Sequence, residues 1–285
     1  MRIRPIALSS FVLLVAVAAA GLLAPVPAAY AARGITLKGS DTMVILAQRW
    51  AENYMRGHSG KVVQVTGGGS GTGIAALING TTDVCMSSRP MKEPEKLKLR
   101  ERFQTRGVEI PVAKDGLSVY VHTSNPVKEL TLDQLRDVYL GKTTNWKALG
   151  GPDEAITLYG RENSSGTYVY FKDTILKGRD FAPRTQTLPG TAAVVNAVAR
   201  DPHGIGYGGA AYAKGVRDLA LSFAPGKPAV APTAATVADG TYPLTRHLYF
   251  YVRNKPAGDV KAFVDWVVSA DGQRLTTEVG YFPLR

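Results

Sequence analysis

The feature that most constrains the fold is a pattern that recurs along the chain. A short apolar segment is followed by glycine or hydroxyl residues and then by a segment with helical apolar spacing, and this happens after residues 34–37, 61–66 and 156–159. Strands that alternate with helices in this way are typical of a parallel sheet covered by helices. The sequence therefore predicts an α/β fold.

The remaining expected elements continue this pattern. We expect further strands at 83–86, 116–122, 204–207 and 248–252, and helices at 42–55, 74–78, 132–140, 168–176, 192–198 and 260–268. Thr131 and Thr191 stand directly before two of these helices and are predicted N-caps. The Ala- and Pro-rich stretch 224–238 is expected to be a surface loop.

The first 31 residues predict a targeting segment and not part of the fold. Arg2 and Arg4 precede an apolar run from about 6 to 23, and small residues lead to the sequence Ala-Tyr-Ala at 29–31. This order is typical of a secretory signal peptide, here cleaved after Ala31. A membrane anchor is the less favoured alternative, because the run is short for a span and ends in prolines and small residues. We therefore expect a periplasmic or secreted protein.

Cysteine content and charge exclude several classes of protein. Cys85 is the only cysteine in 285 residues, which excludes an intramolecular disulfide and a site built from several thiolates. Lys and Arg exceed Asp and Glu by 34 to 23, but they alternate with acids, as in residues 92–96. No basic stripe with interleaved aromatic residues is present, so we expect no nucleic-acid partner. Cys85 itself stands in an apolar run and is predicted to be a buried small hydrophobe.

Motifs for catalysis or for metal and cofactor binding are weak. The four histidines, His58, His122, His203 and His247, are isolated and form no zinc-binding pattern. Ser70 does not fit the nucleophile motif G-x-S-x-G, since residue 72 is threonine. Residues 71–76 match only a relaxed dinucleotide fingerprint. We expect no enzymatic activity, no metal and no cofactor.

Three segments share one arrangement of small polar residues where a predicted strand meets a predicted helix. They are Ser40-Asp41-Thr42, Ser70-Gly71-Thr72 and Ser165-Gly166-Thr167. The free N–H groups and the dipole at a helix start attract an anion, and hydroxyl groups add donors. For any single segment a simple N-cap is the more common role. Three of them together predict an anion site.

Arg161 precedes the last of these segments. Its planar guanidinium can form two parallel bonds to an oxyanion and stays charged at any working pH. A surface salt bridge with Glu162 or another acid is the alternative. Its position at the end of a strand, four residues before Ser165, favours a role in the site.

The chain resembles the PstS-type phosphate-binding proteins of ABC transporters. The resemblance rests on residues 39–42, 67–73, 87–90, 130–135, 141–146, 161–167, 204–207, 272–273 and 280–281, in that order and spacing. It implies a two-lobed type II periplasmic-binding-protein fold, with the ligand in a cleft between the lobes and two hinge crossings. The implied lobes are residues 33–116 with 247–285, and residues 117–246.

The resemblance also implies the ligand residues. They are Thr42, the Met43 amide, Ser70, Arg161, Ser165, Gly166 and Thr167, with Ser40, Asp41 and Ser88 beside them. Ser88 departs from the pattern, because well-known members have an aspartate there that accepts the phosphate proton. Asp41 either supplies that acceptor by pointing into the cleft or caps its own helix.

The function that follows is capture of inorganic phosphate by an exported monomer that presents it to a membrane ABC permease. A protein for another tetrahedral oxyanion is the alternative within the binding class. An exported hydrolase of phosphate esters is the contrasting alternative, and it would need a metal or a base that the motifs do not supply.

Overall fold

The computed structural model describes residues 34–284. The predicted signal peptide at 1–31 lies outside the described residues.

The described residues form a mixed sheet of nine strands. Its order is β2 (Val63–Thr66), β1 (Ile35–Gly39), β3 (Val84–Ser87), β11 (Thr245–Val252), β4 (Val108–Val121), β8 (Gly204–Gly209), β6 (Thr157–Arg161) and β7 (Gln186–Leu188), while β9 (Arg217–Asp218) pairs with β4. The strands β1, β2 and β3 are parallel, and so are β6, β7 and β8. A separate parallel pair joins β5 (Glu129–Thr131) to β10 (Ala220–Ser222). The predicted α/β fold is confirmed.

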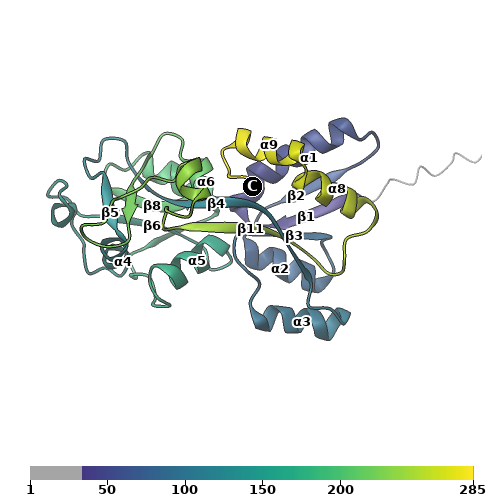
Figure 1. Ribbon diagram of the computed structural model, residues 1–285. Helices are drawn as coiled ribbons and strands as arrows, with labels where there is room; N and C mark the ends of the chain where they lie inside the picture. The colour runs from purple at the N-terminus through teal and green to yellow at the C-terminus, as the bar shows by residue number, and fades with distance from the viewer. Residues whose placement is uncertain (1–33, 285) are drawn as a thin grey trace, which may run out of the picture. The chain divides into compact units, whose positions relative to one another are not determined.

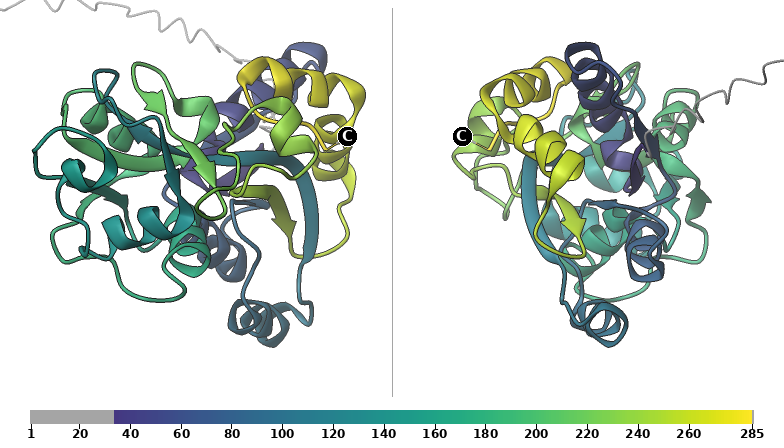
Figure 2. Two further views of the ribbon diagram at one scale, coloured as in Figure 1. Left: turned by 60° about the vertical axis from the view of Figure 1, so that its left-hand side comes forward. Right: turned by 90° about the vertical axis from the view of Figure 1, so that its right-hand side faces the viewer.

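Helices flank these strands (Figure 1). They are α1 (Val44–Gly57), α2 (Ser70–Asn79), α3 (Glu93–Phe103), α4 (Leu132–Tyr139), α5 (Gly166–Thr174), α6 (Gly190–Val198), α7 (Ala234–Ala238), α8 (Gly258–Val268) and α9 (Ala270–Val279), with short 3-10 turns η1 (Asp41–Met43), η2 (Trp146–Leu149) and η3 (Ala210–Tyr212). Figure 2 shows α8 and α9, in yellow, beside the purple α1 in both views.

Two of the predicted caps had different outcomes. The Thr131 hydroxyl accepts a hydrogen bond from the Gln134 amide at 3.0 Å, so this N-cap is confirmed. The prediction for Thr191 is wrong, because α6 begins at Gly190 with Pro189 in the N-cap position. Thr191 therefore lies in the first turn, where its hydroxyl is available to a distant partner.

Buried side chains gather in separate clusters, of which the two largest lie at different parts of the sheet. One contains Trp50 and Phe250, with β1, β3, β11 and the helices α1, α8 and α9 around it. The other contains Trp146 and Tyr207, with α4, α5, β6 and β8. Phe282 belongs to the second cluster although it follows α9, so the carboxy-terminal segment reaches both.

The strand β4 runs through both parts of the sheet. Its residues up to Gly116 pair with β11, and from Leu117 onward they pair with β8. β4 and β11 lie side by side between the helices of the two parts (Figure 1). Residues near this change of partner are therefore close to both parts of the molecule.

Candidate anion-binding site

Hydroxyl groups from distant parts of the sequence meet between the two cores. The Thr42 and Thr167 hydroxyl oxygens lie 2.8 Å apart, and those of Ser70 and Ser88 lie 3.3 Å apart. All four residues are buried. Thr42 lies in η1, Ser70 and Thr167 lie in the first turns of α2 and α5, and Ser88 follows β3. The structure thus brings together residues that the sequence predicted as one site.

The hydroxyl residues lie inside the helices and not before them. We expected helices from residues 74 and 168, whereas α2 begins at Ser70 and α5 at Gly166. The first amide groups of both helices therefore belong to the predicted segments themselves. Some of them already have partners, because the Gly71 amide donates to the Ser164 carbonyl oxygen and the Thr167 amide donates to the Ser165 hydroxyl.

Two glycines allow the segments to approach each other. A Cβ atom on Gly166 would lie 2.3 Å from the Ser70 hydroxyl oxygen and 2.6 Å from that of Ser88. Gly69 has φ +93°, and a Cβ atom there would lie 2.6 Å from the Ser164 carbonyl oxygen. The Gly71 amide donates to that same carbonyl at 2.9 Å. A side chain at either glycine would force the segments apart.

Arg161 is 1% exposed and is held on several sides. Its Nη2 donates to Asp41 Oδ2 at 2.9 Å, and its Nη1 donates to the Thr191 hydroxyl at 2.8 Å. The Glu162 carboxylate lies 3.5 Å from Nε, so the ion pair weighed as an alternative exists beside the other contacts. These partners fix the guanidinium plane next to the hydroxyl cluster.

Asp41 does not cap its own helix, which was one of the two arrangements considered from the sequence. One carboxylate oxygen accepts from the Gly68 amide at 2.8 Å, and the other accepts from Arg161. No side chain caps η1, whose N-cap position is held by Ser40. Asp41 joins the glycine segment to Arg161, and both of its oxygens are already occupied by donors.

Other predicted residues have local partners. The buried Ser40 accepts at its carbonyl oxygen from the Met43 amide at 2.9 Å, so this amide is used within η1. The Ser165 hydroxyl accepts from the amides of Thr167 and Tyr168 at 3.2 and 3.3 Å, and Ser165 is the N-cap of α5. These residues shape the turns that carry the hydroxyl groups.

A second arginine, which was not predicted from the sequence, lies beside the cluster. Arg246 donates through Nε and Nη2 to Asp115 Oδ2 at 3.0 and 2.8 Å, and Nη2 also donates to the Thr167 hydroxyl at 2.9 Å. Burial raises the pKa of Asp115, while Arg246 opposes that rise. Asp115 and Arg246 both stand just before predicted apolar strands, at 116–122 and 248–252, and this position was the available signal.

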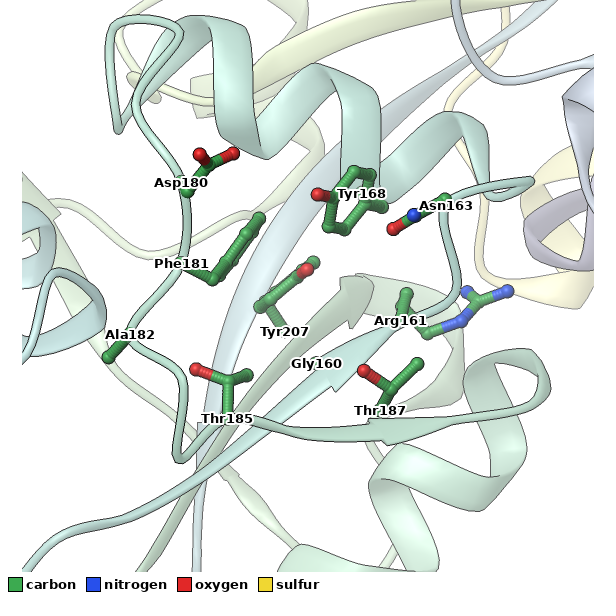
Figure 3. A pocket seen from close by; sticks show the side chains of 10 residues that line it. All are labelled: Gly160, Arg161, Asn163, Tyr168, Asp180, Phe181, Ala182, Thr185, Thr187 and Tyr207. Carbon is green, nitrogen blue, oxygen red and sulfur yellow. The ribbon is translucent and has the colours of Figure 1, made fainter.

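A cavity of about 190 Å³ borders Arg161, and none of the four clustered hydroxyl residues lines it. It is lined by Gly160, Arg161, Asn163, Tyr168, Asp180, Phe181, Ala182, Thr185, Thr187 and Tyr207. In Figure 3 the Arg161 guanidinium points away from Phe181 and Tyr207. Arg161 is the only residue of the candidate site that also lines this cavity.

Among residues 34–284, no three His, Cys, Asp or Glu side chains are grouped so that they could hold a metal ion. None of the helices described there combines the length and the apolar character that crossing a membrane requires. Cys85 is buried, as predicted, and burial raises the pKa of its thiol.

Comparisons with known proteins identify relatives along most of the chain. A family model described as PBP superfamily domain matches residues 25–271. The phosphate-binding protein PstS of Pseudomonas aeruginosa is 35% identical over 268 residues, which cover 86% of this chain and 81% of that protein. The phosphate-binding protein PstS of Bacillus subtilis is 32% identical and covers 89% of this chain and 82% of its own length.

Solved structures that resemble this chain are also named as phosphate transport proteins. A substrate-binding protein from Clostridium perfringens with bound phosphate superposes with a TM-score of 0.81 at 26% identity, covering 88% of this chain and all of its own. An ABC-type phosphate transport receptor from Vibrio cholerae gives a TM-score of 0.70 at 30% identity, over 87% of this chain and 99% of its own.

Proposed function

Because the chain belongs to the PstS family of phosphate-binding proteins, within the PBP superfamily, we propose that it captures inorganic phosphate for an ABC transporter. Its fold is the two-lobed type II periplasmic-binding-protein fold. The protein acts by binding and release, without covalent chemistry.

One observation carries the proposal. A buried arginine and four buried hydroxyl groups, contributed by both parts of the sheet, converge at the starts of two helices. Removing a phosphate dianion from water costs a large free energy unless charged and neutral donors replace its hydration shell. This cluster supplies both kinds of donor in a place shielded from water.

The proposed ligand groups follow from this geometry. Arg161 supplies the positive charge, and Thr42, Ser70, Ser88 and Thr167 supply hydroxyl donors. The amides in the first turn of α5 add the partial positive charge of a helix start. Ser40, Asp41, Met43, Ser165 and Gly166 position these donors. When phosphate enters, the hydroxyl groups exchange their contacts with each other for contacts with its oxygens.

The two lobes are proposed as residues 33–116 with 247–285, and residues 117–246. Contacts between them include Thr42 with Thr167, Asp41 with Arg161, and the Gly71 amide with the Ser164 carbonyl. Phosphate that contacts both lobes stabilises the closed arrangement, and the two strand crossings near Gly116 and Arg246 serve as hinges.

Selectivity among tetrahedral oxyanions is the part of the site in which this chain departs from its family. The Ser88 hydroxyl can donate or accept, so it does not require a protonated ligand oxygen. Both oxygens of Asp41 already accept hydrogen bonds, which favours a role in holding Arg161 over a role as proton acceptor. A binding protein for another tetrahedral oxyanion is therefore the second candidate function.

The cellular setting is part of the proposal. The segment 1–31 is a signal peptide that is cleaved near Ala31, and the mature protein is a periplasmic or secreted monomer. It presents its ligand to a membrane ABC permease and uses no cofactor.

Calorimetric titration of the purified protein with phosphate, sulfate and arsenate tests the function directly. We expect saturable binding of one phosphate and of the similar arsenate. Absence of phosphate binding, with sulfate bound instead, would replace the proposal with the second candidate. Turnover of a chromogenic phosphate ester would overturn the assignment to a binding protein.

A further inference from the structure

Asp115 and Arg246 form an ion pair where β4 changes its partner strand. They are paired across β4 and β11, two positions before Leu117 begins to pair with β8. Asp115 is 1% exposed and Arg246 is 7% exposed. A buried ion pair is weak evidence of stabilisation, because well-packed apolar residues often serve as well. Its position between the lobes therefore calls for a role other than stability.

One nitrogen of the Arg246 guanidinium, Nη1, has no hydrogen-bond partner among the described residues. Nε and Nη2 both donate to one Asp115 oxygen, whereas the buried Nη1 has no hydrogen-bond partner within residues 34–284. Buried donors without a partner are uncommon, because each carries a desolvation cost. The guanidinium also lies over the Tyr170 ring, 5.1 Å from its centre, which fixes its plane. Arg246 is thus a rigid cation with unused capacity to donate.

The contact between Arg246 and Thr167 decides what the threonine hydroxyl can do. An arginine can only donate, so the Thr167 oxygen must accept from Nη2. The single hydroxyl proton of Thr167 is then free to point away from Arg246. The Thr42 hydroxyl oxygen lies 2.8 Å from the same oxygen. An anion held between the two threonines would receive this proton.

We propose that Arg246 is a second arginine of the anion site, which fixes the Thr167 hydroxyl as a donor to the ligand and adds positive charge next to it. Asp115 holds Arg246 in place. The inference rests on the proposed function and deepens it. It names a group that determines phosphate affinity and lies outside the three hydroxyl segments 40–42, 70–72 and 165–167.

Two arginine–carboxylate pairs then belong to the site. Arg161 with Asp41 is one pair, and Arg246 with Asp115 is the other, whose arginine contacts Thr167. Each pair is close to neutral, so the site can exist without ligand at moderate cost in free energy. A phosphate that enters is attracted by both guanidinium groups.

The first test compares phosphate affinity in Arg246→Gln and Arg253→Gln by calorimetry. Arg253 follows the same strand, is half-buried and donates to the Thr82 carbonyl oxygen, so its replacement removes the same charge away from the site. We expect Arg246→Gln to weaken phosphate binding at least about tenfold and Arg253→Gln to change it less than about threefold. Equal effects of the two variants would overturn the proposal.

A second variant separates binding from folding. Arg246→Gln leaves the Asp115 carboxylate buried without its partner, which can destabilise the chain by itself. The double variant Arg246→Met with Asp115→Leu removes both charges and keeps an apolar contact. We expect it to melt cooperatively and still to bind phosphate at least about tenfold more weakly than the wild type. Wild-type affinity in this variant would show that the pair is only structural.

A double-mutant cycle tests whether Arg246 acts through Thr167. We expect Thr167→Val to weaken phosphate binding and Arg246→Gln to cost less in the Thr167→Val background than in the wild type. Strictly additive losses would overturn the positioning role. If the wild-type protein binds phosphate and Arg161→Ala does not, whereas all Arg246 variants bind normally, the proposed function stands and this inference fails.

Discussion

Replacement of Arg161 by alanine tests the central group of the proposed site. Arg161 is 1% exposed, and two of its nitrogens donate to Asp41 and Thr191, which hold the guanidinium in place. Hydrogen bonds that involve a charged group contribute roughly 1.5–3 kcal/mol each, and a guanidinium can form two with one phosphate. Their loss corresponds to about 3–6 kcal/mol, or roughly two to four orders of magnitude in Kd. Without its partner, Asp41 also repels the ligand.

Calorimetric titration with phosphate at neutral pH and constant ionic strength measures this loss. Arg184→Ala is the matched control, because Arg184 is exposed in the same part of the chain and its loss changes the net charge equally. Arg161→Lys should recover part of the affinity, since it keeps the charge without the planar fork. If the Kd of Arg161→Ala stayed within about threefold of wild type, or roughly 0.65 kcal/mol, the reasoning would be refuted.

Three further predictions concern closure, selectivity and packing. Phosphate should reduce the radius of gyration in small-angle scattering, because it draws the two lobes together, and an unchanged radius at saturation would contradict hinge closure. Asp41→Asn should weaken phosphate and sulfate to a similar degree, because Asp41 holds Arg161; loss of the preference between the two anions in a competition titration would instead make Asp41 a proton acceptor. Gly166→Ala should weaken phosphate binding at least about tenfold while the melting temperature changes little, since its Cβ would lie 2.3 Å from the Ser70 oxygen; normal affinity would show that the segments can move apart.

Local signals in the sequence predicted the parts of the fold that depend on neighbouring residues. Thr131 and Gln134 are three positions apart and cap α4 as a pair, so the pattern itself contains the contact. The helix α3 could not be predicted from apolar spacing. Leu99 is its only fully buried residue, so its sequence has no apolar stripe. The helix forms because its start is capped and because it packs on α2.

The candidate site was predictable as a set of residues but not as a network. Hydroxyl segments at strand ends identified Thr42, Ser70 and Thr167 because each lies where a helix begins. The pairing of Arg161 with Asp41 joins positions 120 residues apart, and that of Arg246 with Asp115 joins positions 131 residues apart. Only the register of β4 and β11 brings the second pair to the cluster. No short sequence motif predicts that register.

The order of the strands has a consequence for how the chain folds as it is made. Trp50 packs against Phe250 and donates to the carbonyl oxygen of Gly272, and β3 lies between β1 and β11 in the sheet. The amino-terminal segments therefore complete their core only with residues near the other end of the chain. Residues 117–246, in contrast, contain most of their own core. Contacts over such long separations form slowly, since a large loop must close first. During synthesis the middle of the chain can thus become compact first, and the anion site is completed only after β11, which pairs with β3 and β4, has been made.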